Sequence, residues 1–568
     1  MHITVPKRWV IAESDAKKVE FLSSVLKVKK ILSSLLVLRG LNTFEEAEKF
    51  FNPSLEDLHY PFLMKNMSLA VQRIEQAIQH KEGILIYGDY DVDGTTSVSL
   101  VQNFLIPIHP HIDFYIPDRY TEGYGISLKG IDYAVEQNIG LVIALDCGIR
   151  AVDQIEYAKE KGVDFIICDH HTPGSIIPDA LAVLDPKQTD CPYPYKELSG
   201  CGIGFKLCQA LAIKLGIDLK KVYEQLDILV VSIASDIVPI TGENRTLAWF
   251  GLKKLNDNPQ AGLKTLLELI GRKKPLHITD IVFGIGPHIN AAGRLKHGRY
   301  PVLLLTSQKA GEIMQLSQQL HQLNTDRKQL DQAITADALE QLRATPDNEN
   351  QKSSVVWGKD WHKGVVGIVA SRLIEYYYRP TIVLTEDDGY LSGSARSVAG
   401  FNILEAIESC SQWLHKYGGH KYAAGLSMKK KHFESFDAQF NQYVSEHIPA
   451  DSLFPKIRID TEVKFSDLTL RFYHAMSRMA PFGPGNMNPV FLAKRLSCRW
   501  QASIVGEGHL KLSLIQDGVT MPAIAFNQGN KLSLVNAGPF DICFSINLNE
   551  WNGKSNLQLN IKDIRPCE

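Results

Sequence analysis

The sequence predicts an α/β protein whose first large domain is built on a doubly wound, mostly parallel sheet. From residue 83 onward, short β-prone apolar runs alternate with helical segments, as they do in a parallel sheet covered by helices. A second α/β segment follows one long amphipathic helix. From about residue 455 the chain has short strand-like runs separated by Gly, Asn and Asp turns, which indicate a small C-terminal β-barrel.

The elements of the first domain follow from local patterns. An amphipathic helix is predicted over 68–81, residues 1–55 are expected to be helical and irregular, and residues 200–305 are expected to be mainly helical. Helices are also predicted near 95–105, 127–138 and 150–161. The strands predicted between them are 84–87, 113–116, 141–145, 165–168 and 181–183.

The second half divides at a polar linker. Apolar spacing over 309–343 predicts one long helix, and the polar stretch 345–353 is the predicted linker. Strands are then expected at 354–357 and 380–384, with a helix at 365–378. The expected domains are an N-terminal helical segment (1–55), the first α/β domain (56–305), a connecting helix with linker (306–349), a second α/β domain (350–450) and the β-barrel (451–568).

Composition is ordinary for a folded protein, with 45% hydrophobic residues, 22% charged residues and a net charge of −2. Any nucleic acid must therefore be held by local basic patches. The nine cysteines form no C-x-x-C pair, which argues against a zinc ribbon or a disulfide scaffold. The N-terminus does not resemble a signal peptide and no apolar run could span a bilayer, so we expect a cytoplasmic protein without membrane contact.

Three carboxylates follow the first predicted strand at alternate positions. They are Asp89, Asp91 and Asp93 in the sequence Gly-Asp-Tyr-Asp-Val-Asp-Gly, residues 88–94. Residues two apart share a face of an extended chain, so these groups would crowd the end of the strand. Like charges that close cannot all stay ionised without a cation. A surface turn rich in Asp and Gly is the structural alternative.

Two further strand ends carry groups of the same chemistry. Asp146 follows 141–145, and Asp169-His170-His171 follows 165–168. Ligands of doubly wound sheets bind beyond the carboxyl ends of the strands, where these groups would meet. Carboxylates with neutral imidazole suit Mn²⁺ and related ions, whereas Mg²⁺ prefers oxygen alone. By spacing alone, Asp236 would be an ordinary helix-end Asp.

The ordered series of motifs resembles the DHH phosphoesterase superfamily, and within it the RecJ family of single-strand-specific exonucleases. The DHH motifs are residues 88–94, 146–148, 169–171 and 235–236. Residues 114–120, 122–125 and 286–295 narrow the resemblance to RecJ. Residues 361–372, 393–397 and 418–425 are similar to the DHHA1 domain, and 481–486 resemble the start of the OB-like module. The resemblance extends from about residue 35 to the end of the chain.

The resemblance implies a two-metal phosphodiester hydrolysis with two Mn²⁺ or Mg²⁺ ions. The implied metal ligands are Asp91, Asp93, Asp146, His170 and Asp236, with Asp146 and Asp236 bridging the ions. Asp89 would lie just behind these ligands or join them occasionally, and His171 would face the scissile phosphate. The catalytic residues expected from the resemblance are therefore His171, Asp146 and Asp89.

The resemblance also implies a set of substrate contacts. Arg372 has an ion-pair alternative, and the Gly-rich run 418–425 could instead be a tightly packed helix entry. His288 stands where the family usually has Arg, and Lys421 where a small residue is usual. The C-terminal basic and aromatic residues suit single-strand binding, the alternative being a solvated face with a buried Trp. The expected substrate-binding residues are Arg119, Asn290, Arg294, His362, Arg372, Arg396, Gly418, Gly419 and His420.

The function expected from the resemblance is 5′→3′ hydrolysis of single-stranded DNA to 5′-mononucleotides, in DNA repair and recombination. A helicase and a single-strand-binding protein are the expected partners, and a monomer the expected state. One rival is a DHH enzyme for pyrophosphate, short oligonucleotides or cyclic dinucleotides, which would not need the third domain. The other is a non-catalytic scaffold, which the complete ligand set argues against.

Overall fold

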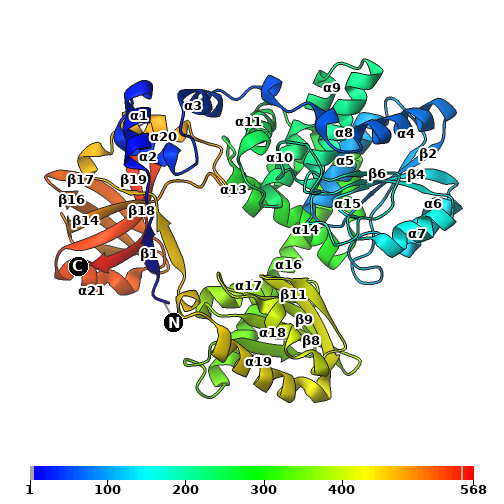
Figure 1. The fold of residues 1–568 in the computed structure, drawn as a ribbon. Coiled ribbons are helices and arrows are strands. Elements are labelled where there is room, and N and C mark those ends of the chain that lie inside the picture. The colour runs from blue at the N-terminus through cyan, green and yellow to red at the C-terminus, as the bar shows by residue number, and fades with distance from the viewer. Residues whose placement is uncertain (1–4, 552–553, 568) are drawn as a thin grey trace. The chain divides into compact units, whose positions relative to one another are not determined.

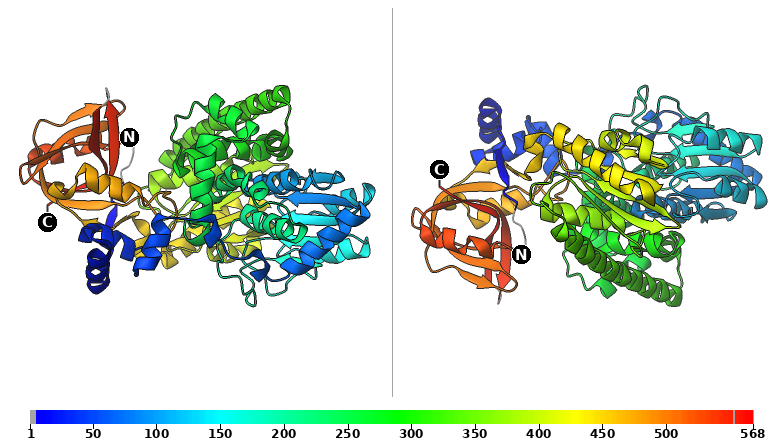
Figure 2. Two further views of the ribbon diagram at one scale, coloured as in Figure 1. Left: turned by 90° about the horizontal axis from the view of Figure 1, so that it is seen from above. Right: turned by 90° about the horizontal axis from the view of Figure 1, so that it is seen from below.

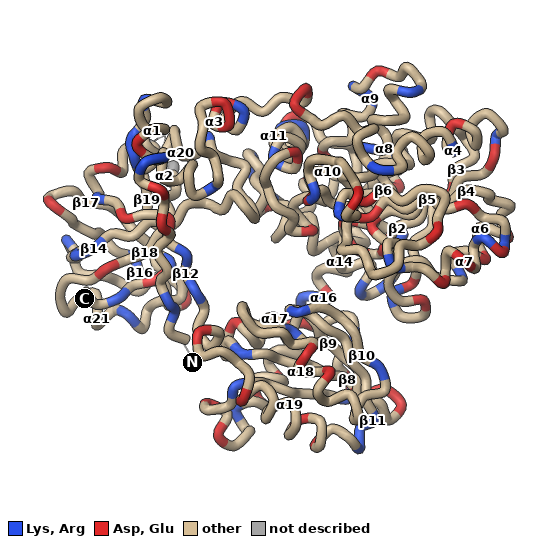
Figure 3. Tube along the Cα trace, in the orientation of Figure 1, with Lys and Arg blue, Asp and Glu red and all other residues tan. Residues whose placement is uncertain are grey.

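The computed structural model describes residues 5–551 and 554–567, which form two compact units. The parallel-sheet unit contains Leu41–Thr325 together with Ser477–Asn488. The composite unit contains the chain up to Gly40, Asp326–Met476 and the chain from Pro489 on. Figure 1 shows the elements of each, and basic and acidic residues are interspersed over both (Figure 3). The two units therefore interleave along the sequence, so neither is one continuous segment.

The sheet of the parallel-sheet unit has five parallel strands in the order β3-β2-β4-β5-β6. Each predicted strand is present, with its ends moved by at most two residues. The strands are β2 (Gly83–Gly88), β3 (Ile112–Tyr115), β4 (Ile139–Leu145), β5 (Asp164–Cys168) and β6 (Ala182–Leu184).

Alternate residues of these strands enter two different cores. Ile84, Ile143 and Ile166 pack in one hydrophobic cluster with helices α4 (Met67–His80), α5 (Val92–Leu105) and α8 (Gly200–Leu215). Leu85 and Val142 pack in another with α6 (Leu128–Glu136) and α7 (Val152–Glu160). Helices thus cover both faces, as Figure 1 and Figure 2 show, and the predicted doubly wound sheet is confirmed.

The rest of the parallel-sheet unit is helical, as predicted for 200–305. One segment, η3 (Ile281–Ile285), is a π-helix rather than an α-helix. The helices are α3 (Phe44–Phe51), α9 (Lys220–Tyr223), α10 (Leu226–Ser235), α11 (Gly242–Asp257), α12 (Ala261–Ile270), α13 (Ile278–Asp280), α14 (Gly286–Leu295) and α15 (Arg299–Thr306). The predicted long helix is α16 (Ala310–Ala344), which starts in this unit and ends in the other.

The second α/β segment, in the composite unit, has a five-stranded sheet in the order β10-β11-β9-β8-β7. Only β7 and β8 are parallel, so this sheet is mostly antiparallel. The predicted linker 345–353 has no helix or strand, and the buried guanidinium of Arg379 donates to the carbonyls of Asn348 and Gln351 within it. The elements are β7 (Ser354–Gly358), α17 (Val366–Tyr377), β8 (Thr381–Asp387), β9 (Tyr390–Arg396), α18 (Ile403–Glu408), β10 (Lys416–His420), β11 (Ala423–Lys429) and α19 (Phe433–His447).

The C-terminal strands form the predicted barrel, which the pairing of β14 with β16 closes. Most strands of this region are short, as predicted, whereas β18 and β19 are 12 and 13 residues long. The elements are β12 (Lys456–Ile459), β13 (Thr461–Glu462), α20 (Leu470–Ser477), β14 (Phe491–Cys498), β15 (Ser503–Val505), β16 (His509–Gln516), β17 (Val519–Ala525), α21 (Leu532–Ala537), β18 (Phe540–Trp551) and β19 (Lys554–Pro566).

The N-terminal residues belong to the composite unit. Helices α1 (Ala16–Leu26) and α2 (Lys30–Val37) agree with the sequence, but the strand β1 (Arg8–Ile11) was not predicted. It pairs in parallel with β12, and the Trp9 indole donates to the Asp563 carboxylate at 2.8 Å. A four-residue strand with so distant a partner leaves no periodic signal in the sequence. Among the described residues, no helix is both long and apolar enough to cross a membrane.

A short turn, Met479–Asn486, joins the parallel-sheet unit from a distant part of the chain. The guanidinium of Arg245 on α11 donates to the carbonyls of Met479 and Ala480, at 2.9 and 3.0 Å. The Ile240 amide donates to the Pro484 carbonyl at 2.6 Å. Asn486, 1% exposed, donates to the carbonyls of Met479 and Pro481 and so holds the turn in shape.

We expect Arg245→Met to loosen this turn. The guanidinium is buried, and its loss leaves the Ala480 carbonyl without this donor, at a cost of about 1–3 kcal/mol, whereas the Met479 carbonyl keeps its bond from Asn486. The thermal midpoint should fall, and limited proteolysis should cut within 477–488 faster than in the wild type. Arg299→Met, at an exposed arginine, is the control. Equal cleavage rates in Arg245→Met and the control would contradict this assignment.

Candidate metal centre

The carboxyl ends of three neighbouring parallel strands bring the predicted acidic and imidazole groups together. Asp89 follows β2, Asp146 follows β4 and Asp169 follows β5. The chain runs from β2 to β3 on one side and then to β4 on the other, so strand order reverses at β2. Such a reversal opens a crevice at the strand ends where ligands of α/β sheets bind.

Asp93 is held by the N-terminus of a second helix. Its carboxylate accepts hydrogen bonds from the amides of Gly200 and Cys201, at 2.7 and 2.9 Å. The Ser232 hydroxyl on α10 donates to it at 2.7 Å. The start of α8 carries partial positive charge, so it stabilises an ionised Asp93 that is 2% exposed. The orientation of this carboxylate is fixed before any ion binds.

Asp91 and Asp89 lie at the start of α5. Asp91 is the N-cap of that helix and accepts from the Gly94 amide at 3.1 Å. Burial, followed by the negative charge of a neighbouring aspartate, raises the pKa of both carboxyl groups. In the described part of the chain, Asp89 Oδ1 is buried without a hydrogen-bond partner. A nearby cation would stabilise the ionised form of both carboxyl groups.

Asp146 is held in a strained conformation. Its φ is 60°, in the left-handed region that residues other than Gly rarely adopt, and its amide donates to the Cys168 carbonyl at 2.9 Å. A Cβ on Gly200 would lie 2.6 Å from the Asp146 Cβ, so only glycine fits there. Burial and the neighbouring aspartates raise the pKa of Asp146 well above its ordinary value. The surroundings thus impose a strained backbone that presents this carboxylate.

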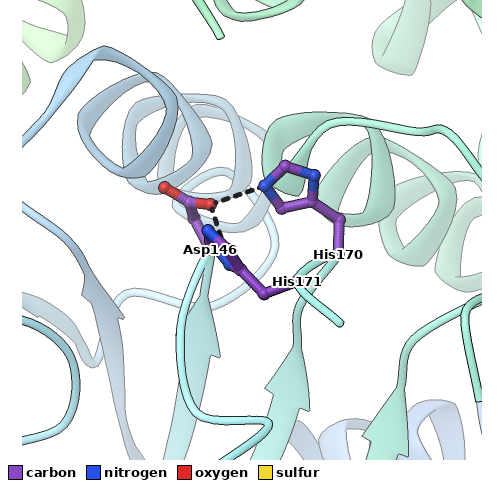
Figure 4. Close-up of side chains that lie close together, drawn as sticks. All are labelled: Asp146, His170 and His171. Atoms are coloured by element: carbon purple, nitrogen blue, oxygen red, sulfur yellow. Dashed lines mark ion pairs between the residues drawn. The ribbon is translucent and has the colours of Figure 1, made fainter. Parts of the chain in front are cut away.

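His170 is where the candidate ligands converge. Its Nε2 lies 3.1 Å from Asp146 Oδ1, 3.6 Å from Asp236 Oδ2 and 3.7 Å from Asp93 Oδ2. Figure 4 shows Asp146, His170 and His171 pointing toward one another. Burial lowers the pKa of His170, which favours the neutral imidazole that binds metals. Among the described residues, neither ring nitrogen of His170 has a hydrogen-bond partner.

Asp236 enters the cluster from the C-terminal end of α10. Burial, then the charges of Asp93 and Asp91, raise its pKa to about 8. The next residue, Ile237, is β-branched, has φ 61° and is 63% exposed, so it is a second left-handed position beside the cluster, after Asp146. Residue spacing alone does not indicate that this aspartate reaches the strand ends.

Asp169 positions His171 rather than joining the ligands. Its Oδ1 accepts from His171 Nδ1 at 2.8 Å and from the His170 amide at 2.8 Å, and its Oδ2 accepts from the Ile149 amide at 2.9 Å. Burial alone would raise the pKa of Asp169, but these bonds hold it below its ordinary value. In return, Asp169 outweighs burial at His171 and raises its pKa to about 9. We had assigned no role to Asp169, although it is the first residue of the Asp-His-His motif.

The donor set fits a divalent ion. Two groups of side chains have ligand atoms within 4.8 Å of one another, Asp93-His170-Asp236 and Asp146-His170-His171. Asp89 and Asp91 are outside both groups, although their charge affects the pKa of their neighbours. Several buried carboxylates of raised pKa around a neutral imidazole form a site that a first-row divalent ion would neutralise.

The predicted substrate residues fall into two sets. Arg119, Asn290 and Arg294 are partly exposed residues of the parallel-sheet unit, and the Arg119 guanidinium lies 4.2 Å from the centre of the Tyr90 ring. The other set belongs to the composite unit and consists of His362, Arg372, Arg396, Gly418, Gly419 and His420.

Within the composite unit, Arg372 and the Gly-rich run have clear local roles. Arg372 Nη2 lies 2.7 Å from the carboxylate of Asp331 on α16, which is the ion-pair alternative of the sequence analysis. Residues 418–425 form a hairpin of the exposed strand β10 with β11, so the helix-entry alternative was wrong. Arg396, at the end of the adjoining strand β9, donates to the Ser394 hydroxyl at 2.6 Å.

The two departures from the family pattern lie in different surroundings. His288 is 4% exposed, and its Nδ1 lies 2.7 Å from the Gly284 carbonyl. It is therefore a core residue of α14 and offers no exposed cation. Lys421 is exposed in the β10–β11 hairpin, with its ammonium 5.6 Å from the centre of the Tyr422 ring.

Comparison with known proteins decides the family. Residues 83–233 match the DHH family, N-terminal domain, residues 350–446 match the DHHA1 domain, and residues 459–563 match the RecJ OB domain. The chain is 36% identical to the single-stranded-DNA-specific exonuclease RecJ of Bacillus subtilis, over 99% of this chain and 71% of that protein. It is 31% identical to the Escherichia coli protein of the same name, over 94% of this chain and 96% of that protein.

The chain belongs to the RecJ family. A crystal structure of RecJ in complex with Mn²⁺ from Thermus thermophilus matches 99% of this chain and 80% of its own, with a TM-score of 0.85 and 28% identity. The corresponding Mg²⁺ complex matches with a TM-score of 0.80 and 26% identity. The predicted RecJ-like fold and the expected Mn²⁺ or Mg²⁺ cofactor are thereby confirmed. The assignments of individual site residues and of domain boundaries stay predictions.

We expect Gly200→Ala to weaken metal binding. The added Cβ would displace Asp146, and the Gly200 amide could no longer orient Asp93 as it does now. Affinity for Mn²⁺ should fall about 10–100-fold, the usual cost of disturbing groups that orient ligands. Gly311→Ala is the control, because a Cβ there meets open space. Calorimetric titration with Mn²⁺ measures these affinities. Equal affinities in Gly200→Ala and Gly311→Ala would contradict the role assigned to Gly200.

We expect Asp236→Asn to stabilise the metal-free protein while weakening its binding of Mn²⁺. The folded-state pKa of about 8 exceeds the unfolded value of about 3.9, so the stability that the protonated group contributes is lost as pH rises toward 8. The neutral amide avoids this loss. In chelator, thermal midpoints should favour the variant by an amount that grows from pH 5 to pH 8. Asp153→Asn, at an exposed aspartate on α7, should show no such trend.

Proposed function

We propose that this RecJ-family chain is a divalent-metal-dependent exonuclease that removes 5′-mononucleotides from single-stranded DNA in the 5′→3′ direction. The observation that carries the proposal is the complete set of acidic and imidazole groups at the ends of β2, β4 and β5, in a chain whose curated relatives are named single-stranded-DNA-specific exonucleases. We further propose a cytoplasmic monomer in DNA repair and recombination, working with a helicase and a single-strand-binding protein.

Asp91, Asp93, Asp146, His170 and Asp236 are the proposed ligands of two divalent ions. Such ions, when bound, lower the pKa of an attacking water and neutralise charge on the phosphoryl oxygens. Asp93 and Asp146 need little reorganisation to act, because helix α8 and the strained Asp146 backbone already orient them. Asp89 supports this set through the negative charge it adds behind Asp91.

His171 is the proposed group facing the scissile phosphate. Asp169 accepts the hydrogen of Nδ1, which leaves Nε2 for substrate, with the Tyr124 hydroxyl 3.3 Å from that atom. With a pKa of about 9, His171 is protonated at neutral pH and can donate from Nε2 to a phosphoryl oxygen. Its side chain is 42% exposed, in contrast with the buried His170, as a group that meets substrate requires.

The remaining substrate contacts proposed from family resemblance are cations and small residues. The proposed DNA contacts of the parallel-sheet unit are Arg119, Asn290 and Arg294, and those of the composite unit are His362, Arg372, Arg396, Gly418, Gly419 and His420. The exposed glycine pair in β10 would allow a phosphate to approach the backbone closely. Because Arg372 already pairs with Asp331, its proposed contact with DNA would use the exposed part of its guanidinium.

The barrel offers the chemistry for holding a single strand. Trp500 is 66% exposed, so the buried-Trp alternative of the sequence analysis was wrong, and the Arg499 guanidinium lies 5.3 Å from its ring centre. Phe526 is 50% exposed and stacks edge-on with His509. Exposed aromatic rings beside cations bind bases and phosphates without sequence preference. The barrel is therefore the proposed site for the strand beyond the scissile bond.

The test is a nuclease time course with Mn²⁺ or Mg²⁺. Substrates are one oligonucleotide labelled at the 5′ end, the same one labelled at the 3′ end, and its blunt duplex. We expect immediate release of labelled mononucleotide from the 5′ end, a shrinking ladder from the 3′ label and an intact duplex. Turnover of pyrophosphate or dinucleotides without degradation of the strand would instead favour the small-substrate rival.

Asp146→Ala should abolish hydrolysis, a loss of at least 10³-fold in kcat, because it removes a proposed bridging ligand. Much of the affinity for DNA should remain, since the cations that would bind phosphates are untouched. Fluorescence anisotropy with a labelled single strand measures that affinity. Asp153→Ala on the exposed face of α7 is the control. An unchanged rate in Asp146→Ala would show that the metal site is assigned wrongly.

A further inference from the structure

The Glu-Gly-Tyr-Gly motif at residues 122–125 places an exposed aromatic ring beside the metal centre. Tyr124 is 56% exposed, although its hydroxyl lies 3.3 Å from the carbonyl of Asp146 and 3.3 Å from Nε2 of His171. The ring centres of Tyr124 and His171 are 5.9 Å apart, at an interplanar angle of 78°. One end of the Tyr124 ring therefore meets the catalytic groups while much of its surface remains open to solvent.

The loop that carries Tyr124 has a firm base. The Asp118 carboxylate accepts from the amide of Thr121 at 2.9 Å, and its own amide donates to Glu122. The other oxygen of Glu122 accepts from the hydroxyls of Tyr115 and Ser127, at 2.9 and 2.6 Å. These bonds tie the loop to β3 at one end and to the start of α6 at the other, so its base is fixed relative to the sheet.

The tip of the same loop is built on two glycines. Gly123 and Gly125 flank Tyr124 with φ values of 87° and 86°, in the left-handed region that glycine adopts without strain. A Cβ at either position would meet no atom within 4 Å. The left-handed backbone conformation, rather than close packing, therefore requires glycine on both sides of Tyr124.

We propose that Tyr124 is the platform on which the base of the terminal nucleotide stacks while its phosphodiester bond lies at the metal centre. The inference deepens the proposed function and rests on it. Every base has an aromatic face, so stacking holds the terminal nucleotide without reading its identity. The exposed face of the ring is open to a purine or a pyrimidine, and the contact of Tyr124 with His171 sets the stacked base at a fixed distance from the catalytic group.

Two variants separate stacking from a role of the hydroxyl. Tyr124→Leu removes the aromatic face, whereas Tyr124→Phe keeps the face and removes only the hydroxyl near His171. The matched control is Tyr60→Leu, because Tyr60 is 54% exposed and lies on a different loop of the same unit. Circular dichroism melts check that each variant is folded.

The experiment compares an oligonucleotide that has a normal 5′-terminal nucleotide with one whose terminal nucleotide is abasic, under Mn²⁺ and with initial rates. We expect wild type, Tyr124→Phe and Tyr60→Leu to show a KM about tenfold lower for the normal end. Tyr124→Leu should lose that preference through a higher KM for the normal end, with kcat and the abasic KM little changed. With 2-aminopurine as the terminal base, binding should quench its fluorescence in Tyr124→Phe but not in Tyr124→Leu.

Several results would overturn the inference. If the wild type has the same KM for the normal and the abasic 5′ end, it has no stacking platform, whatever the variants show. A Tyr124→Leu variant that keeps the preference places the platform elsewhere. A fall in kcat shared by Tyr124→Phe and Tyr124→Leu would make the tyrosine a positioning residue for His171. If the wild type degrades neither strand, the proposed function itself fails, and that result is distinct from these three.

Discussion

The repulsion among buried carboxylates at one edge of a parallel sheet is the constraint on which the other features of this structure depend. Asp89, Asp91, Asp146 and Asp236 are all driven toward protonation by burial and by one another. A fold gains nothing in stability from such a cluster without a cation, so the surrounding structure must hold it together. The amides at the start of α8, the serine on α10 and the packing of Gly200 all serve that purpose.

Two neighbouring histidines show how the same environment yields opposite electrostatic outcomes. His170 is buried with no carboxylate bound to its ring at hydrogen-bonding distance and geometry, so burial dominates and favours the neutral form. His171 is more exposed and bonded to Asp169, so the charged form is favoured. One side chain thus suits a metal and the next suits a phosphate. Asp169, which contacts both residues, is the group that separates their roles.

Much of this structure could be predicted from local sequence, and the exceptions share a cause. The strands of the parallel sheet, helix α16 and the strand-end positions of Asp89, Asp146 and His170 follow from apolar runs and their spacing. Asp236 could be recognised only by resemblance, because a helix end reaches the strand ends through tertiary packing alone. The pairing of β1 with β12 and the ion pair of Arg372 are likewise set by partners far away in the sequence. Periodicity carries no information about such partners.

The Met479–Asn486 turn has a consequence for how this architecture can change over evolutionary time. The residues that match the OB-domain model, 459–563, include this turn, yet its contacts are with the unit that holds the metal centre. A barrel exchanged between relatives as a cassette would therefore bring a foreign turn against Ile240 and Arg245, only a few residues beyond Asp236. A substitution in the turn is therefore expected to require a matching substitution near Ile240 or Arg245. We therefore expect the barrel and the parallel-sheet unit, which are separate in fold, to be inherited together.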